Sequence, residues 1–400
     1  MLYWLQEYLT NLGWHVPAVF GYTSTRVIMA AMTSLLFCLF AGPYFIRKLY
    51  ELKIGQPIRE ADGFLLGDLH KNKKNTPTMG GILMIAAMLL SLLLWMDLKS
   101  PFTLILCVTT LVLGFLGGYD DYLKLYYKNP NGLSARKKLA VQLVWALLVA
   151  AYLQIPSVST ALHIDSWFEP PVIKEFFTDV KLGHQLTLKD YSSRIYIPFF
   201  KEPIYIFSGI GLFFMWAFYA FVVVGSSNAV NLTDGLDGLA TGLCMFVAGA
   251  IGTFAFLANN QDLAHYLNIL YVQGSGEIAI YMAAVCGACL GFLWFNCHPA
   301  QLFMGDIGSL TLGGVLGVSA VLLKREFFLG LVGAIFVVEA LSVILQVASY
   351  KLRDKKRIFL CAPLHHHFEY KGWPESKVVI RFWIIGLLLA LIGLASIKFQ

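Results

Sequence analysis

One polar stretch of this 400-residue chain, residues 228–240, has the composition of a phosphate-binding or cation-binding site. Asn228, Asn231, Asp234 and Asp237 recur every three residues, so they share one face if they lie on the start of a helix. Glycines follow both aspartates, and the free N–H groups of a helix N-terminus attract an anion. A helix cap needs only one such residue, so the spacing predicts a functional site.

A second polar stretch, residues 295–309, contains Asn296, Phe303 and Asp306. Asp306 stands at the start of an apolar run, which again predicts a carboxylate at a helix start. Carboxylate and amide oxygens are the ligands that hard cations prefer. Phe303 could stack on a base, although an anchor at the membrane interface is nearly as good an interpretation.

Asp120 and Asp121 form a third acidic group, preceded by glycines and followed by Lys124. Helix termination in the headgroup zone is the simpler interpretation of this pair, but the glycines and the lysine favour a role in handling phosphate. Neither of the two polar stretches contains Lys or Arg. Carboxylates gathered without local positive partners repel one another, and a divalent cation is the usual remedy.

Basic residues gather in two further segments. Lys73 and its neighbours precede Thr76, and a run of cations at 353–357 precedes three consecutive histidines that include His365 and His366. Because these histidines follow cations, they suit phosphate better than a metal ion. The basic run alone could also hold anionic lipid, at about 1 kcal/mol per charge.

The elements that must position these groups follow from composition. Hydrophobic residues make up 58% of the chain, charged residues 14%, and the mean hydropathy is +0.67. Soluble proteins carry about 25% charged residues. We therefore predict an all-α polytopic integral membrane protein, with residues 1–400 forming a single membrane-embedded domain. The same values exclude a disordered chain, a disulfide scaffold and a soluble nucleic-acid binder.

About ten transmembrane helices are predicted, because ten apolar runs are long enough to cross about 30 Å of hydrocarbon. The connections on one side hold 19 of the 30 Lys and Arg residues, and those on the other side, termini included, hold 9. The positive-inside rule then makes both termini extracytoplasmic and places the polar stretches at the cytoplasmic face. The predicted spans are roughly 25–46, 79–96, 102–119, 138–155, 204–225, 236–257, 277–295, 308–323, 327–348 and 379–397.

Residues 156–203, between the fourth and fifth spans, are too polar and too rich in proline to cross a membrane. Their alternating stretches predict a small extracytoplasmic insert such as a hairpin. We find no catalytic cluster in its sequence.

Glu339 lies in the middle of the ninth predicted span. An ionisable side chain is costly at this depth and marks a functional or structural contact. We expect it to bond a neighbouring polar group, with substrate contact as the alternative.

The motifs resemble those of the polyprenyl-phosphate N-acetylhexosamine-1-phosphate transferase superfamily, over about residues 58–398. The Asp120–Asp121 pair and the stretch 228–240 are marks of the superfamily. The sequence Pro-Leu-His-His-His-Phe-Glu at 363–369 is typical of its phospho-N-acetylmuramoyl-pentapeptide transferase branch, the translocase I family. The insert is longer than this resemblance leads us to expect, but it lies away from the predicted chemistry.

The resemblance implies a reaction in which UDP-N-acetylmuramoyl-pentapeptide and undecaprenyl phosphate give lipid I and UMP, with Mg²⁺ as cofactor. This is the first membrane step of peptidoglycan synthesis. The resemblance also implies a multi-pass protein of the bacterial inner membrane, a homodimer, and a groove for membrane lipid beside the ninth helix.

The resemblance also implies residue roles. Asp306 is the implied magnesium ligand, and Asp120 and Asp121 lie at the lipid phosphate, with Asp120 as a base or as a group that orients the nucleophile. The implied nucleoside pocket consists of Asn231, Asp234, Asn296 and Phe303. The implied phosphate contacts are Lys124, Lys137, His365 and His366, and Lys73, Thr76, Asn228, Asp237 and Gln346 complete the predicted substrate site.

Two other functions fit part of the sequence. A sister enzyme would transfer N-acetylglucosamine-1-phosphate, which the His-rich segment argues against. A cation-coupled transporter would place its ionisable groups near the midplane of the membrane, whereas here all but Glu339 are predicted at one face. For a transferase, direct attack and a two-step route through an aspartyl-phosphate both remain open, and we favour direct attack.

Overall fold

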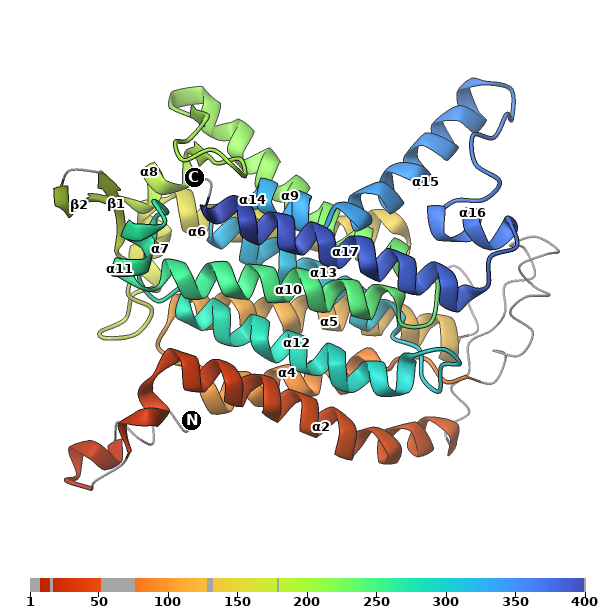
Figure 1. Cartoon of the computed structure of the whole chain (residues 1–400), viewed down its shortest axis with the longest axis horizontal. Helices are drawn as coiled ribbons and strands as arrows, with labels where there is room; N and C mark the ends of the chain where they lie inside the picture. Colours follow the sequence, from red (N-terminus) through yellow and green to blue (C-terminus); the bar gives the residue numbers. More distant parts are fainter. Residues whose placement is uncertain (1–7, 15–16, 52–75, 128–131, 178–179, 399–400) are drawn as a thin grey trace.

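The computed structural model describes residues 8–14, 17–51, 76–127, 132–177 and 180–398. Long helices run side by side in one bundle, and short strands and helices gather at one end of it (Figure 1). The long helices are α2 (Thr23–Glu51), α4 (Gly81–Trp95), α5 (Pro101–Tyr126), α6 (Ala135–Gln154), α9 (Leu212–Thr233), α10 (Leu239–Ala258), α12 (Gly276–Asn296), α13 (Gly305–Leu322), α15 (Ala334–Leu352) and α17 (Glu375–Lys398).

Nine of the helices that the structure describes are long and apolar enough to cross a membrane. The remaining predicted span, 79–96, corresponds to α4, whose 15 residues fall short of the roughly 20 that a span needs. The polytopic helical fold is thus confirmed, while the count of ten and the side on which the termini lie stay predictions.

Two predicted spans differ from the helices observed. The predicted span 204–225 corresponds to α9, which starts later and continues to Thr233, because strand β4 (Tyr205–Ile206) and the 3₁₀ helix η4 (Gly209–Gly211) precede it. The predicted span 327–348 is divided at Gly333 into α14 (Glu326–Val332) and α15. An apolar run alone could not reveal either feature, because both parts of a broken helix remain apolar.

Helix α13 forms the centre of the bundle, with 89% of its residues buried. Its glycines allow this close packing: a Cβ atom added at Gly313 would lie 2.4 Å from the backbone oxygen of Ser226 in α9. Small residues at helix contacts let backbones approach within a membrane in this way.

The end of the bundle that carries the strands includes the predicted insert, residues 156–203. Strands β1 (Ile173–Phe177) and β2 (Val180–Leu186) form the expected antiparallel hairpin. Strand β1 also pairs with β5 (Tyr271–Val272), which comes from the connection between α10 and α12. The description all-α therefore holds for the bundle and not for these connections. The remaining elements of this end are the 3₁₀ helix η1 (Ala18–Gly21), α7 (Pro156–Leu162), α8 (Leu188–Ser192), β3 (Arg194–Ile195) and α11 (Gln261–Tyr266).

The opposite end of the bundle holds the predicted site residues. Helices α5, α9 and α12 end here, and α10, α13 and α17 begin here. Helix α16 (Leu364–Tyr370) lies between the ends of α15 and α17, and α15 leans away from the other helices (Figure 1).

Candidate active site

Three carboxylates form the centre of the site. Asp120 and Asp121 come from the end of α5 and Asp306 from the first turn of α13, with one oxygen of each within 4.8 Å of the others. A Cβ atom added at Gly117 would lie 2.4 Å from the backbone oxygen of Asp306, so only glycine allows α5 and α13 to approach this closely. Gly305, at φ +75°, has its Cβ position 2.6 Å from Oδ2 of Asp121.

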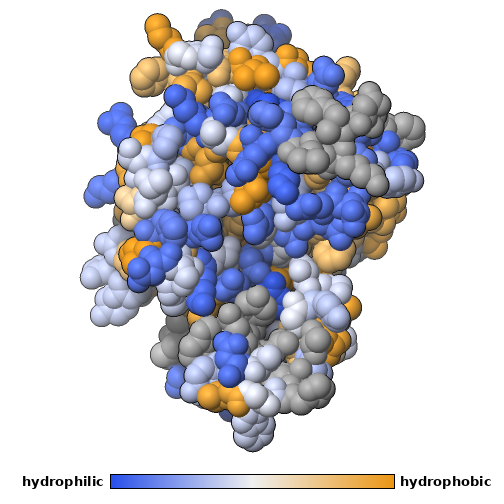
Figure 2. All heavy atoms as spheres, turned by 90° about the vertical axis from the view of Figure 1, so that its left-hand side faces the viewer, coloured by the Kyte–Doolittle hydropathy of each residue, from blue (hydrophilic) through white to orange (hydrophobic). Residues whose placement is uncertain are grey.

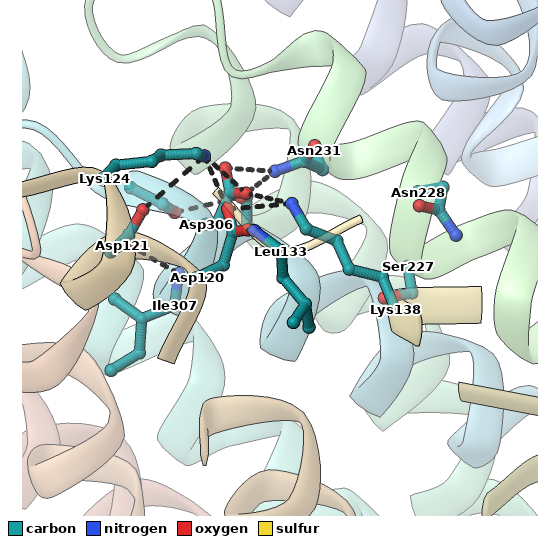
Figure 3. A network of polar contacts seen from close by, with 12 residues as sticks. Asp120, Asp121, Lys124, Leu133, Lys138, Ser227, Asn228, Asn231, Asp306 and Ile307 are labelled. Atoms are coloured by element: carbon teal, nitrogen blue, oxygen red, sulfur yellow. Dashed lines mark hydrogen bonds and ion pairs between the residues drawn. The ribbon is translucent and has the colours of Figure 1, made fainter. Parts of the chain in front are cut away.

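Two lysines neutralise part of this charge (Figure 3). The Nζ atom of Lys124 lies 2.6 Å from Asp120 Oδ2 and 2.9 Å from Asp306 Oδ2, and the Nζ atom of Lys138 lies 2.8 Å from both. The expectation that the carboxylates lack positive partners was wrong, because Lys124, which follows the Asp pair on α5, and Lys138 on α6 both lie among them. Three carboxylates against two ammonium groups still leave one negative charge.

The three carboxylates differ in access to solvent. The side chain of Asp120 is 0% exposed and that of Asp121 6%, against 17% for Asp306. Asp120 Oδ1 accepts a hydrogen bond from Leu133 N at 2.6 Å, and Asp121 Oδ2 accepts one from Ile307 N at 3.1 Å. Asp306 is therefore the carboxylate that an incoming ligand can reach most easily.

Asn231 and Asn228 lie in the last two turns of α9, not at the start of the following helix as predicted. Asn231 Nδ2 donates to Asp306 Oδ1 at 3.0 Å and to Ser309 Oγ at 2.9 Å, and Asn228 Nδ2 donates to Gln142 Oε1 at 2.9 Å. Because both amides have partners on neighbouring helices, α9 continues through them. Asn231 thus orients Asp306, a contact that the predicted nucleoside role did not include.

Asp234 follows directly as the C-cap of α9. Burial and the neighbouring carboxylates raise the pKa of Asp234 to about 8, so a large part of it is protonated at neutral pH. The carboxylates that contribute are those of Asp306, Asp121 and Asp237. Burial is the largest cause of this raised pKa, and the neighbouring negative charges add to it.

Asp237 belongs to a separate polar group that fastens the loop before α10. Its Oδ2 lies 3.1 Å from both His298 Nδ1 and Ala300 N, and its own N–H donates to Glu375 Oε1 at 2.7 Å. Asp237, His298 and Glu375 are close enough to hold a metal ion as well. Because Glu375 belongs to α17, these contacts tie the loop to the C-terminal helix.

Asn296 is 2% exposed and joins the two polar stretches. Its Oδ1 accepts hydrogen bonds from Gly238 N at 3.1 Å and Thr241 Oγ1 at 3.0 Å, and its Nδ2 donates to Leu302 O at 2.9 Å. These contacts give Asn296 a positioning role, since its polar atoms are already bonded within the protein.

Thr76 and Phe303 lie side by side, although the sequence separates them widely. Thr76 Oγ1 donates to Ala300 O at 3.5 Å, and Phe303 N donates to Pro77 O at 2.9 Å. The segment that follows the predicted lysine cluster therefore runs along the second polar stretch. Lys73 itself lies outside the described residues.

His365 and Glu339 form a fully buried pair between α16 and α15. Glu339 accepts from the backbone N–H of His365 at 3.1 Å, and its Oε2 lies 3.1 Å from His365 Nδ1. The expected polar neighbour of Glu339 is thus His365. Burial lowers the pKa of His365, so its ring is neutral and its Nε2 faces Gly235, where an added Cβ would lie at 2.3 Å. His366 Nδ1 pairs with Glu369 Oε2 at 2.6 Å.

Gln346 lies on α15 and bonds the chain that leads into α16. Its Oε1 accepts from the N–H groups of Ile358 and Phe359, both at 3.0 Å, and its Nε2 donates to Phe359 O at 3.0 Å. The structure therefore gives Gln346 a role in holding this segment.

Lys137, the predicted phosphate contact, is exposed on α6, and the neighbouring Lys138 lies among the carboxylates instead. The sequence does contain a signal that Lys138, and not Lys137, points toward polar groups. Lys138 and Gln142 are four residues apart on one helix face, and a glutamine inside an apolar span marks the face that meets polar groups.

A cavity of about 440 Å³ opens next to Lys138, between α6 and α9. Apolar and polar side chains both line it, and Lys138 links it to the carboxylates. The lining residues are Leu133, Ala135, Lys138, Leu139, Gln142 and Asn228.

Comparisons with known proteins found a matching family model and relatives that match along nearly the whole chain. Residues 103–324 match the family model described as Glycosyl transferase family 4. The chain is 64% identical over 395 residues to the phospho-N-acetylmuramoyl-pentapeptide-transferase of Protochlamydia amoebophila (strain UWE25), covering 96% of each chain. It is 48% identical over 400 residues to the proteins of that name from Francisella tularensis subsp. mediasiatica (strain FSC147) and subsp. novicida (strain U112), covering 100% of each chain.

Proposed function

Because the chain belongs to the phospho-N-acetylmuramoyl-pentapeptide transferase family and is an enzyme of that kind, we propose its specific reaction. The enzyme transfers phospho-N-acetylmuramoyl-pentapeptide from its UDP conjugate to undecaprenyl phosphate, which gives lipid I and releases UMP. The carboxylate and lysine cluster around Asp306 is the observation that carries this proposal. Phosphoryl transfer requires mainly positioning and neutralisation of charge, and both are available here.

Mg²⁺ is the proposed cofactor, and the residues present fit it. Asp306, with Asp120 and Asp121, offers only oxygen ligands, and the cluster retains a net negative charge beside its two lysines. Mg²⁺ typically binds through one or two carboxylates together with substrate phosphates. When bound, it would neutralise the charge that develops on the diphosphate.

In the proposed reaction, an oxygen of the lipid phosphate attacks the sugar-linked phosphorus of the donor. The bond from that phosphorus to the bridging oxygen breaks, and the electron pair leaves with UMP. The ammonium groups of Lys124 and Lys138 already contact carboxylate oxygens and are positioned to donate to phosphate oxygens once these arrive.

Asp120 is better suited to orient groups than to take a proton. It is fully buried and already contacts Lys124, Lys138 and the N–H of Leu133. The second pKa of a phosphate monoester is near 6, so most of the lipid phosphate has lost its proton at neutral pH. The burial of Asp120 also supports direct attack over an aspartyl-phosphate on this residue.

The cavity between α6 and α9 is the proposed approach for the lipid phosphate. Leu139 and other exposed apolar residues of α6 lie at its edge, and Lys138 lies at its inner end. A polyprenyl chain could thus remain among lipids while its phosphate reaches the carboxylates. This route adds a second candidate to the lipid groove that the family resemblance implies beside α15.

Location and assembly belong to the same proposal. The distribution of Lys and Arg supports a multi-pass protein of the bacterial inner membrane with its site facing the cytoplasm. The family resemblance adds a homodimer and a place in peptidoglycan synthesis.

Donor choice tests the proposed reaction. Purified protein in detergent, supplied with undecaprenyl phosphate and Mg²⁺, is expected to release UMP from UDP-N-acetylmuramoyl-pentapeptide and not from UDP-N-acetylglucosamine. Turnover of only the second donor would assign the protein to the sister branch. If folded protein released no UMP from either donor, the result would contradict the proposal.

Lys138→Met is expected to lower kcat/KM by about 10²-fold, because one of the two cations that contact Asp306 is lost. Lys137→Met is the matched control, since the same side chain one position earlier is exposed. Its effect is expected to stay below about 3-fold. Initial rates of UMP release measure both, and a larger loss in Lys137→Met would reverse the assignment.

Glu339→Gln is expected to lower kcat by about 10-fold, because the neutral amide no longer fixes the orientation and tautomer of His365 as firmly. Glu339→Leu is expected to lower the thermal midpoint as well, since it leaves the N–H of His365 buried without an acceptor. Retained folding and activity in both variants would show that the pair has no positioning role.

A further inference from the structure

Three consecutive charged residues lie buried at the end of the bundle that carries the sheet, opposite the carboxylate cluster. Lys324 and Glu326 are 0% and 4% exposed, and Arg325 is 6% exposed. The Nζ atom of Lys324 lies 2.7 Å from Glu326 Oε1 and 2.9 Å from the hydroxyl of Tyr219. Lys324 and Glu326 therefore neutralise each other, which leaves the charge of Arg325.

Arg325 has no anionic partner among the described residues. Its Nε forms no hydrogen bond there, and no carboxylate of that part of the chain forms an ion pair with it. Its guanidinium instead lies over two rings, with Cζ 4.9 Å from the ring centre of Tyr196 and 4.5 Å from that of Phe254. Aromatic faces attract a cation but do not cancel its charge, and buried charges in proteins are normally paired.

A cavity of about 130 Å³ adjoins this guanidinium. Other donors also line it: the side-chain amide of Asn268 has no hydrogen-bond partner in the described chain, and Lys201 is exposed at the rim. The hydroxyl of Tyr196 accepts from Arg194 at 3.3 Å and keeps its own proton to donate. The lining residues are Glu175, Phe176, Tyr196, Lys201, Glu202, Asn268, Ile269, Leu270 and Arg325.

We propose that this cavity binds a singly charged oxyanion, with Arg325 as its charge partner. The volume equals about four water molecules, which is enough for a carboxylate or one phosphate group. Glu175 and Glu202 in the wall disfavour a doubly charged anion, although Arg194 neutralises Glu175 at 2.8 Å.

The source of this anion is either the phosphodiester of a lipid headgroup or a small soluble carboxylate. Hydrophilic side chains cover much of this end of the molecule, with apolar residues among and around them, as expected where a headgroup layer meets water (Figure 2). The site lies away from the transferase residues, so the inference goes beyond the proposed function and does not depend on it.

Thermal unfolding of the purified full-length chain tests this proposal. One of two probes is expected to raise the midpoint of the wild type by about 3 °C. The first is sodium acetate, compared with sodium chloride at equal ionic strength, and the second is phosphatidylglycerol, compared with a neutral lipid. Sodium sulfate stabilises proteins in general, so its shift is expected to be the same in the wild type and in Arg325→Gln. A response to acetate identifies a soluble ligand, and a response to phosphatidylglycerol alone identifies a headgroup.

Arg325→Gln is expected to abolish the shift, whereas Lys201→Gln, at the rim, is expected to keep at least about half of it. If Arg325→Gln does not fold, the double variant Tyr196→Phe, Asn268→Ala provides the test. It removes two donors from the cavity while retaining Arg325, and it is expected to reduce the shift. Equal shifts with acetate or phosphatidylglycerol in the wild type and these variants, or no shift with either probe, would overturn the proposal.

Discussion

Asp306→Ala is expected to lower the rate of UMP release by at least about 10³-fold, because the variant loses the most accessible of the three clustered carboxylates. The loss should appear in kcat at saturating concentrations of both substrates. The physical reason is charge: without Asp306, two lysines face two buried carboxylates, and no net negative charge remains to hold a divalent cation. Titration of the rate with Mg²⁺ measures the effect.

Two controls accompany this variant. Asp306→Asn keeps the size of the side chain and is expected to be nearly as inactive, which separates loss of charge from loss of packing. Asp262→Ala, an exposed aspartate in α11 at the other end of the bundle, is expected to retain wild-type activity. Near-normal activity of Asp306→Ala that still requires Mg²⁺ would refute its role as the metal ligand.

Asp120→Asn is expected to lower kcat by about 10²-fold, because this fully buried carboxylate holds both Lys124 and Lys138 in place. If Asp120 only orients these cations, the loss should be constant between about pH 7 and 9, where the lipid phosphate is already dianionic. The measurement is the ratio of wild-type to variant kcat across this range.

The pH profile separates orientation from proton transfer. A general base would give a ratio that changes with pH, since hydroxide or buffer can replace the missing base at high pH. Glu51→Gln, which alters an exposed ion pair with Lys48 at the end of α2, is the matched control and is expected to leave kcat unchanged. A strongly pH-dependent ratio would contradict the orienting role.

The sequence predicted the polytopic helical fold because apolar runs of span length have few other stable forms. It also predicted that the Asp120–Asp121 pair and Asp306 would lie at the same face, since alternating spans leave them on one side. Contacts between helices could not be predicted in this way. Which face of α6 turns inward decides between Lys137 and Lys138, and a one-residue change on a helix rotates the side chain by about 100°.

The role of the amides was also beyond the sequence. The three-residue spacing from Asn228 to Asp237 suggested a helix start, yet α9 ends within this stretch. The helix continues to Thr233 because Asn228 and Asn231 find partners on α6 and α13, which are distant in sequence. Glu339 illustrates the opposite case: its cost inside an apolar span was visible, and only its partner His365 required the structure.

The position of the bound cation tests the central claim most directly. Crystals of the protein with Mn²⁺ in place of Mg²⁺ and with UMP would be measured at the manganese absorption edge. We expect the anomalous peak at the carboxylate of Asp306, beside Asp120 and Asp121. The structure offers a second group that could hold a metal, Asp237 with His298 and Glu375, and a peak only there would contradict the proposed site.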